Sequence, residues 1–403
     1  MRTKSIHGRT ARVLAMVGGL TLIAGACGSD AKSSSTPASS AAAPAATTAV
    51  TAGAASDTSA AATGGDSGEV SAAQGVVDAA LKSPTAINQT VPLTGKVEQG
   101  RTYVFLQCEL PQCKAIGDGA LDAAKTIGWK TKVIPWQTTD PSTLTSALNQ
   151  ALQFNPIAVT PTGFPQEFWG TVIPAYEKAG VMIVPAAVAN LTISKTVPGG
   201  ASTAFDYAAA GKIMGNWLIA DSKAEAHILV MDVPAYEVLK TYGDAAKAVL
   251  AKGCAKCVVT PLDITLPQLS SNGVIPAIVA ALQKDPSINY LVGTDGAFLG
   301  GIQAAMSAAN ITKVKIAGGA PAITNLQNLV NGTEAAWTGE AISQMGWTIV
   351  DIAARASLGM KIPEADLGRP QQLLVKANVG TPTDSLDAPA DYRDQYKKLW
   401  GIG

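Results

Sequence analysis

The chain has 403 residues, of which 15% are charged and 47% are hydrophobic. Lysine and arginine together number 30, as do aspartate and glutamate, so the formal net charge is zero. Binding to nucleic acid draws on a surplus of basic residues, so this composition argues against a nucleic-acid partner. The length is sufficient for two domains of ordinary size together with an unfolded segment.

The sequence pattern of residues 1–27 predicts an export signal. Basic residues are concentrated between Arg2 and Arg12, and Val13 to Ala26 is an uncharged apolar stretch, too short to span a bilayer comfortably. The stretch leads into Cys27 and resembles a bacterial lipobox, with Ala24 in place of the usual leucine. We therefore expect a lipid anchor at Cys27, on the extracytoplasmic face of a bacterial cell membrane. An ordinary signal peptide with an incidental cysteine is the alternative.

Residues 28–90 are expected to form a disordered tether. From Ser29 to Gly75 the sequence is dominated by Ala, Ser, Thr, Gly and Pro, which bury too little apolar surface to offset the entropy of ordering. Val76 to Leu81 could form one short helix on this stalk. A tether of this kind would let a globular body stand away from the membrane.

The remaining chain alternates between strand and helix patterns. In its first half, strands are expected at 102–107, 132–136, 157–160 and 181–184, and helices at 114–128, 141–154 and 168–179. In its second half, strands are expected at 226–231, 258–260, 290–293 and 315–317, and helices at 208–221, 236–252, 273–284 and 298–309. The pattern predicts an α/β fold with two doubly wound parallel-sheet lobes and a ligand cleft at the carboxyl ends of the strands.

Several segments in this order resemble the type I periplasmic sugar-binding proteins, the ribose-binding-like group. They are Gly117–Gly119, Asn155–Thr162, Asp206–Gly211 and Thr294–Gly296, and the resemblance covers roughly Gly95 to Gly403. It implies two lobes joined by a hinge, one from residues 97–202 plus 341–370 and the other from 203–339 plus 371–403. It also implies a monomer that captures a small, carbohydrate-like solute and delivers it to the permease of an ABC importer.

The chain departs from the sugar-binding pattern at matched positions. Cys108 to Cys113 stands where the family has an Asn and paired aromatics, and Ala187-Val188 replaces an Asp-Arg pair. Thr294 replaces a strand-end Asn, and Glu340 matches a hinge Gln. Most of the groups that would clamp a polyol are therefore missing. We expect ribose to bind poorly, and a small or less hydroxylated ligand is as plausible as a pentose.

Candidate ligand-binding residues follow the predicted strands or lie where the lobes meet. They are Gln107, Glu109, Gln112, Trp136, Phe164, Asp206, Tyr236, Thr294, Asp295 and Glu340. Each has a plainer interpretation. The aromatics could simply pack under loops, Glu109 and Asp295 could be solvated or capping carboxylates, and Asp206 could be structural at the lobe crossing.

Two cysteine pairs favour local disulfides in an exported protein, Cys108 with Cys113 and Cys254 with Cys257. The second pair also has the spacing of a redox motif or a zinc half-site. The chain contains two histidines, His7 in the export signal and His227 in a predicted strand. A nucleophilic triad is therefore hard to assemble, and no phosphate-binding glycine loop of the GxxxxGKS type occurs. We expect no enzymatic activity, cofactor or metal.

Two other functions suit the same body. A ligand-sensing receptor would present its closed form to a membrane partner instead of a permease, and the sequence does not separate this from transport. A transcription regulator of the lactose-repressor type would need an N-terminal helix-turn-helix. That position holds the export signal and the tether, which excludes the regulator.

Overall fold

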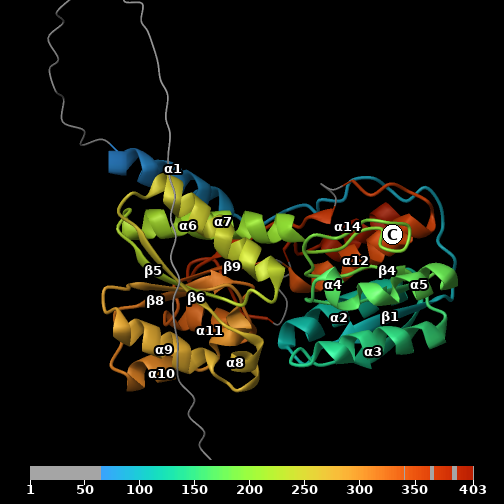
Figure 1. Ribbon diagram of the computed structural model, residues 1–403. Helices are drawn as coiled ribbons and strands as arrows, with labels where there is room; N and C mark the ends of the chain where they lie inside the picture. The colour runs from blue at the N-terminus through green and yellow to red at the C-terminus, as the bar shows by residue number, and fades with distance from the viewer. Residues whose placement is uncertain (1–64, 340, 364–366, 384–387, 403) are drawn as a thin grey trace, which may run out of the picture. The chain divides into compact units, whose positions relative to one another are not determined.

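The computed structural model of the protein describes residues 65–339, 341–363, 367–383 and 388–402. These residues belong to one compact unit that contains two sheets (Figure 1). We call the four-stranded sheet with its helices the first lobe, and the six-stranded sheet with its helices the second lobe. The predicted signal, Cys27, residues 28–64 of the predicted tether and Glu340 lie outside the described residues. In the part of the chain that is described, no helix has the length and apolarity needed to cross a membrane.

The first lobe is built on a fully parallel sheet with strand order β2-β1-β3-β4. Its strands are β1 (Thr102–Gln107), β2 (Lys130–Pro135), β3 (Ala158–Thr160) and β4 (Met182–Ile183). The central strands β1 and β3 are buried almost throughout, while the edge strand β2 is mostly exposed. Burial on both faces explains why β1 appears in the sequence as a continuous apolar run and not as an alternating one.

The second lobe has strand order β10-β9-β8-β7-β5-β6. Its strands are β5 (His227–Asp232), β6 (Val258–Asp263), β7 (Tyr290–Gly293), β8 (Lys315–Gly319), β9 (Ala336–Gly339) and β10 (Gln372–Leu374). All neighbouring pairs are parallel except β10 with β9, which run antiparallel. The reversal of strand order between β5 and β7 opens a crevice at the carboxyl ends of these strands.

Helices cover both sheets. In the first lobe and before it they are α1 (Gly65–Ala80), α2 (Pro111–Thr126), α3 (Pro141–Ala151), α4 (Gln166–Trp169) and α5 (Ile173–Ala179), with short 3₁₀ turns at Leu152–Phe154 and Gly170–Val172. In the second half they are α6 (Ala204–Ser222), α7 (Glu237–Gly253), α8 (Leu266–Ser270), α9 (Val274–Lys284), η3 (Gly296–Leu299), α10 (Ile302–Ala308), α11 (Ile323–Asn331), α12 (Ile342–Ser357) and α14 (Tyr392–Trp400). The elements confirm the predicted α/β class with two parallel-sheet lobes.

Helix α12 packs against α2 in the first lobe and is buried along almost its whole length. The two helices approach closely at Gly119 and Gly346. A Cβ atom added to Gly119 would lie 2.1 Å from the carbonyl oxygen of Ser343, and one added to Gly346 would lie 2.1 Å from the backbone nitrogen of Ala120. Larger side chains at these two positions would therefore separate the helices.

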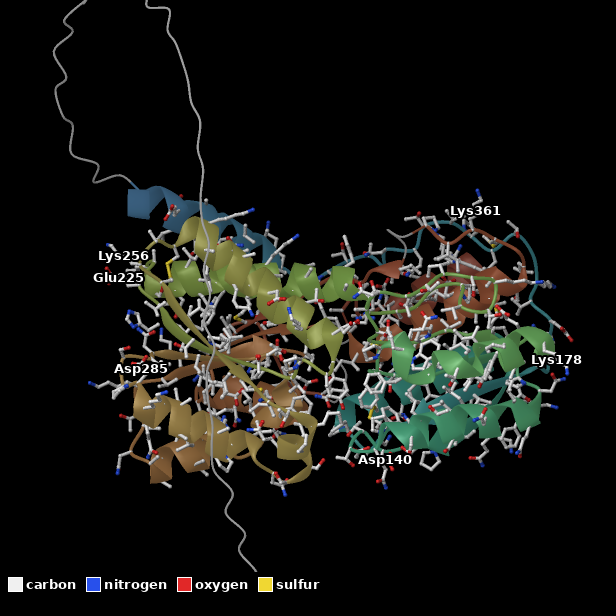
Figure 2. The ribbon with its side chains drawn as sticks, in the orientation of Figure 1. Asp140, Lys178, Glu225, Lys256, Asp285 and Lys361 are labelled. Atoms are coloured by element: carbon white, nitrogen blue, oxygen red, sulfur yellow. A yellow bond between two sulfur atoms is a disulfide. The ribbon has the colours of Figure 1, made fainter. Side chains whose placement is uncertain are left out.

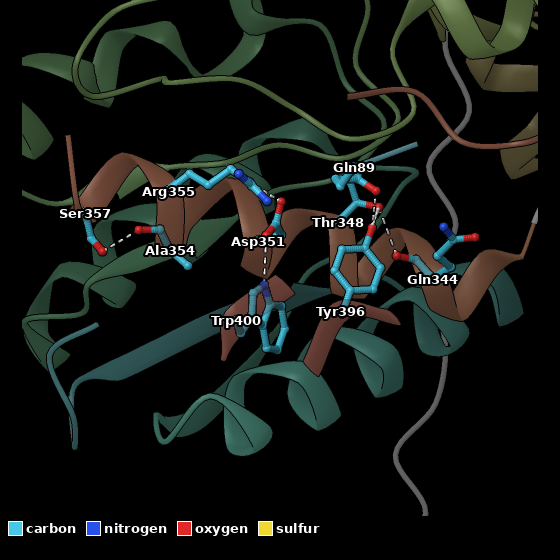
Figure 3. Close-up of polar contacts among 9 residues, drawn as sticks. All are labelled: Gln89, Gln344, Thr348, Asp351, Ala354, Arg355, Ser357, Tyr396 and Trp400. Atoms are coloured by element: carbon cyan, nitrogen blue, oxygen red, sulfur yellow. Dashed lines mark hydrogen bonds and ion pairs between the residues drawn. The ribbon is translucent and has the colours of Figure 1, made fainter. Parts of the chain in front are cut away.

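The C-terminal helix α14 belongs to the first lobe, which corrects the assignment of residues 371–403 to the second lobe. Its Tyr392, Tyr396 and Trp400 recur every four residues and are all buried against α12. The Trp400 ring stacks on Trp347 with a centroid separation of 5.1 Å, and its indole Nε1 donates to Asp351 Oδ1 at 2.8 Å (Figure 3). Strand β10, by contrast, joins the second-lobe sheet, as predicted for this part of residues 371–403.

The predicted disordered tether is wrong over Gly65–Gly75, where the structure has the first part of the helix α1, and the short helix expected at Val76–Leu81 forms the last part of α1. The buried residues Ala73, Val77 and Ala80 lie on one side of α1, which packs against α6 of the second lobe. Spacings of three and four residues place these side chains on one helical stripe. The stripe is hard to see in the sequence because α1 is rich in Ala, Gly and Ser. Each of these small residues buries little apolar area. Ordering in this helix comes from packing on α6.

Both predicted disulfides are present. Cys108, in the loop after β1, is bonded to Cys113 in the first turn of α2, and Cys254 is bonded to Cys257 between α7 and β6. The second pair does not form a metal half-site in the structure, because its sulfurs are bonded to each other. Among the residues that the structure describes, no group of three or more His, Cys, Asp or Glu is arranged to hold a metal ion.

Candidate functional site

A cavity of about 90 Å³ lies between the two lobes, where the carboxyl ends of both parallel sheets face it. One ordered water needs about 10–15 Å³ by this measure, so the cavity has room for a small molecule. The first-lobe segments, together with α12, contribute Cys108, Leu110, Gln112, Cys113, Ile116, Trp136, Thr138, Thr162, Gly163, Ala187, Ile342 and Met345. The second lobe contributes Tyr207, Tyr236, Val238, Leu239, Asp295, Phe298, Ala320 and Pro321.

The first-lobe side of the cavity is shaped by the loop from Cys108 to Cys113. Pro111 begins α2 at a position where its missing N–H and fixed φ are favourable, and the disulfide ties the loop residue Cys108 to Cys113 in the first turn of the helix. Gln112 is thereby placed in the first turn of α2, facing the cavity. Trp136 follows β2, and its indole Nε1 donates to the carbonyl of Leu106 at 3.2 Å, which fixes the ring.

The second-lobe side is shaped by the residues after β5 and β7. Tyr236 immediately precedes α7, and burial raises the pKa of its hydroxyl to about 12. Asp295 follows β7, and its Oδ1 accepts a hydrogen bond from the backbone N–H of Ala297 at 2.8 Å, which begins the η3 turn. Phe298 lies in that turn and lines the same cavity.

Aromatic rings form a continuous series across the two lobes. In the first lobe, the Trp136 and Phe164 rings are 5.7 Å apart. Phe164 then stacks on Tyr236 of the second lobe at 5.2 Å, and Tyr236 stacks on Phe298 at 6.4 Å. Such separations are typical of favourable ring pairs. The series gives the cavity flat apolar surfaces and holds the lobes in contact.

A polar contact also joins the lobes inside the cavity. The amide Nε2 of Gln112 donates to Asp295 Oδ1 at 3.0 Å. Burial disfavours the charged form of the Asp295 carboxyl and raises its pKa to about 7. The other amide atom of Gln112, Oε1, is buried and has no hydrogen-bond partner. The centre of the site therefore combines one carboxyl group with an unused amide acceptor.

The structure brings together part of the predicted residue set. Gln112, Trp136, Tyr236 and Asp295 line the cavity. Phe164 lies behind Tyr236 as its stacking partner, which is the packing interpretation given for the aromatics. Glu340 is outside the described residues.

The remaining predicted residues do not line this cavity. Gln107 donates through Nε2 to the carbonyl of Cys108 at 3.0 Å, and Glu109 is exposed and accepts from the backbone N–H of Thr138 at 3.1 Å. Thr294 is fully buried and donates to Asp232 at 3.3 Å. Asp206 is buried at the lobe crossing, where its Oδ1 accepts from the backbone N–H of Arg369 at 2.8 Å. Each has a structural contact because strand-end polar groups are also needed to satisfy loop backbones.

Several lining residues were absent from the predicted set. Phe298 could have been found from its position three residues after Asp295, where a turn brings it to the same strand end. Ile342 and Met345 come from α12, and their sequence is an ordinary apolar helical stripe. Nothing local in the sequence distinguishes these two from core residues.

Comparison with known proteins agrees with this architecture. The model of the periplasmic binding protein domain family matches residues 110–361. No curated protein sequence matches the chain at a significant level. Among solved structures, the 5-methylthioribose transporter solute-binding protein from Thermotoga lettingae has a TM-score of 0.62 at 16% identity, covering 77% of this chain and 99% of its own.

Two further structures are similar in the same way. GanP, a glucose-galactose binding protein from Geobacillus stearothermophilus, has a TM-score of 0.58 at 18% identity, covering 70% of this chain and 100% of its own. An ABC transporter solute-binding protein from Mycobacterium smegmatis with bound glycerol has a TM-score of 0.60 at 16% identity, covering 70% and 96%. At these identities the likeness concerns the fold. The family model covers more than half of the chain, so the protein belongs to the periplasmic binding protein family, as its resemblance to the type I group predicted.

Proposed function

We propose that the protein is an extracytoplasmic solute-binding protein of an ABC importer, which holds a small solute in the cavity between its lobes and delivers it to the permease. The observation that carries this proposal is the cavity itself, which takes side chains from the strand ends of both lobes. A solute in contact with both lobes binds the closed arrangement more tightly than the open one. It therefore shifts the population toward the closed form.

The lobes already meet through contacts that a closed form needs. Gln112 bonds Asp295, Phe164 stacks on Tyr236, and Asn190 Nδ2 of the first lobe donates to Glu237 of the second at 3.3 Å. Each is a single contact of modest free energy, so the contacts of a bound solute with both lobes can add a comparable contribution to closure. A bound solute can then decide between them.

The predicted anchor and export signal complete the proposal. Lipidation at Cys27 would hold the protein on the outer face of the cell membrane, within reach of a permease. The two disulfides support an exported location, because such bonds persist in oxidising compartments. Metabolic labelling with a fatty acid tests the anchor: label that is lost on Cys27→Ala supports it, and an unlabelled protein contradicts it.

Binding is the direct test of the proposed function. A thermal-shift screen of the mature chain against sugars, polyols, small aromatics and amines should give at least one solute that raises the melting temperature. At a hundredfold excess over the dissociation constant, a ligand bound only by the native state adds about 2.7 kcal/mol. Small-angle scattering should show closure with the same solute. A screen and a scattering profile that both stay unchanged would contradict the proposal.

A matched pair of variants ties the solute to this cavity. Phe298→Ala removes a lining ring and should abolish the thermal shift. Phe205→Ala removes a ring that is 59% exposed and outside the cavity lining, and should leave the shift intact. Equal losses in both variants would place the solute elsewhere.

A further inference from the structure

The ionisable groups around the cavity are unusual for a site that captures a small solute. Among the described residues that line it there is no lysine, arginine or histidine, and the carboxyl of Asp295 is the acidic group. The other polar lining side chains that can bond through an amide or aliphatic hydroxyl are Gln112, Thr138 and Thr162. A bound anion would therefore meet a carboxyl without any cation to offset it.

Asp295 and Gln112, at the centre of the cavity, each have an oxygen atom that can accept a further hydrogen bond. Both hydrogen bonds that Asp295 accepts from described residues end on Oδ1, from Gln112 Nε2 and from the Ala297 N–H, which leaves Oδ2 for a ligand. Gln112 Oε1 is buried and has no partner. A buried acceptor without a donor is unfavourable, because it has lost its hydrogen bond to water and gained none in the protein. A ligand that brings two or more donors to this point would remove that cost.

The rest of the lining is apolar and flat. Rings of Trp136, Tyr207, Tyr236 and Phe298 line the cavity, and aliphatic side chains complete it. Ring faces carry negative charge density and attract a cation placed over them. The rings also favour an apolar body over one that carries a hydroxyl on each carbon, since each buried hydroxyl needs its own partner.

We propose that the solute of this cavity is a small organic ammonium, a primary or secondary amine on an apolar body of about one ring, with its N–H groups directed to Asp295 and Gln112 Oε1. The proposal rests on the proposed function, because it names the ligand class of the same cavity. An ammonium supplies two or more donors and a positive charge at one atom, which matches the free carboxylate oxygen and the free amide oxygen together.

The two alternative ligand classes fit these contacts less well. A pentose or hexose presents several hydroxyls that both donate and accept, and the lining offers few groups to pair with them. An aromatic acid would place its carboxylate against Asp295 and an amide oxygen. The proposed amine differs from the carbohydrate-like solute that the resemblance implied, and it uses the same lobe closure.

Isothermal titration calorimetry with isosteric probes tests the proposal. The probes are 2-phenylethylamine, its neutral counterpart 2-phenylethanol, its acidic counterpart phenylacetate, and the sugars ribose and glucose. At about pH 8 the carboxyl of Asp295 is mostly ionised, and we expect the amine to bind about tenfold more tightly than the alcohol, since bonds to charged groups are roughly twice as strong as neutral ones. Phenylacetate and both sugars should bind more weakly than the alcohol.

Two variants test whether the preference for the amine over the alcohol depends on Asp295 itself or on the overall charge of the protein. Asp295→Asn keeps the shape of the side chain and should erase the preference for the amine over the alcohol. Asp285→Asn removes a carboxylate of the same type that lies partly exposed on the outer surface of the second lobe (Figure 2), and should keep that preference. Circular dichroism of both variants checks that they are folded.

The outcomes distinguish the two proposals. If a sugar binds more tightly than the amine, the ligand class is wrong and the solute-binding function stands. If amine and alcohol bind equally in the native protein, or if Asp295→Asn keeps the preference, the assigned contacts are wrong. If no probe and no compound of the thermal-shift screen binds, the proposed function fails, and the ligand class fails with it.

Discussion

Replacing Asp295 by asparagine should stabilise the ligand-free protein at neutral pH, although it removes a binding group. Burial raises the pKa of this carboxyl from 3.8 to about 7. The folded state therefore keeps the proton up to about pH 7, whereas the unfolded chain releases it near 3.8. Between these values the folded state binds more protons, so its stability falls as the pH rises.

The magnitude follows from the size of the shift. A rise from 3.8 to about 7 corresponds to roughly 4 kcal/mol of lost stability above pH 7. Water that enters the cavity and relaxation of the side chain reduce this figure, so we expect Asp295→Asn to gain about 2 kcal/mol at pH 8. Of the neighbouring groups, Tyr236 stays neutral across the window, because its pKa is about 12.

Urea unfolding measures the effect. The free energy of unfolding of the native protein and of Asp295→Asn should be measured at about pH 5 and pH 8. The difference in this free energy between the two proteins isolates Asp295, because all other groups titrate alike in both. We expect the variant to be more stable at pH 8 and the gap to shrink at pH 5. A gap that is absent, or that is equal at both values, would refute an unfavourable buried carboxylate at this position.

Further predictions concern the ion pair in α12, the cavity rings and α1. Arg355→Met should lower the free energy of unfolding, measured in urea, by about 3–5 kcal/mol, because it leaves the buried Asp351 without the cation that lies 2.6 Å away. Adding Asp351→Leu should recover part of this stability, and a double variant as unstable as Arg355→Met would contradict the reasoning. Tyr236→Ala should weaken solute binding in calorimetry at least tenfold, since it removes a cavity surface and the stacking partner of Phe164; unchanged affinity would place the solute away from this ring. Val77→Ala should lower the free energy of unfolding by about 1–2 kcal/mol, because its side chain is 95% buried against α6 (5% exposed), and no change would mean that α1 does not pack in solution.

Much of the fold could be predicted because it depends on local pattern. The buried run at β1 and the apolar stripe of α2 are visible in the sequence, and both appear within a few residues of their expected limits. Elements after about residue 320 were not assigned individually. Helix α12 illustrates the reason: its polar stripe of Gln344, Thr348, Asp351 and Arg355 is buried, whereas such a stripe in a sequence indicates a solvent-facing side.

The candidate site was predictable as a place and less so as a set of residues. Strand ends locate the cavity, which is why Trp136 and Asp295 were found. Whether a strand-end side chain turns inward or bonds its own loop depends on tertiary contacts. Glu109 and Thr294 were placed on correct loops, but Thr138 and Asp232 hold them away from the cavity. Ile342 and Met345 of α12 lie more than 150 positions along the chain from the first-lobe loops that they meet in the cavity, and no local pattern reveals such a contact.

The return of α14 to the first lobe affects the order in which the protein can fold. The core around Trp347 contains Tyr103, near the start of the body, and Trp400, near its end (Figure 3 shows the Trp400 contact). Synthesis begins at the N-terminus, so this core cannot close until Trp400 has left the ribosome. Contacts of such long sequence separation also slow folding. The first lobe, although it begins first, is therefore completed only after α14 has been made, later than the last strand of the second lobe.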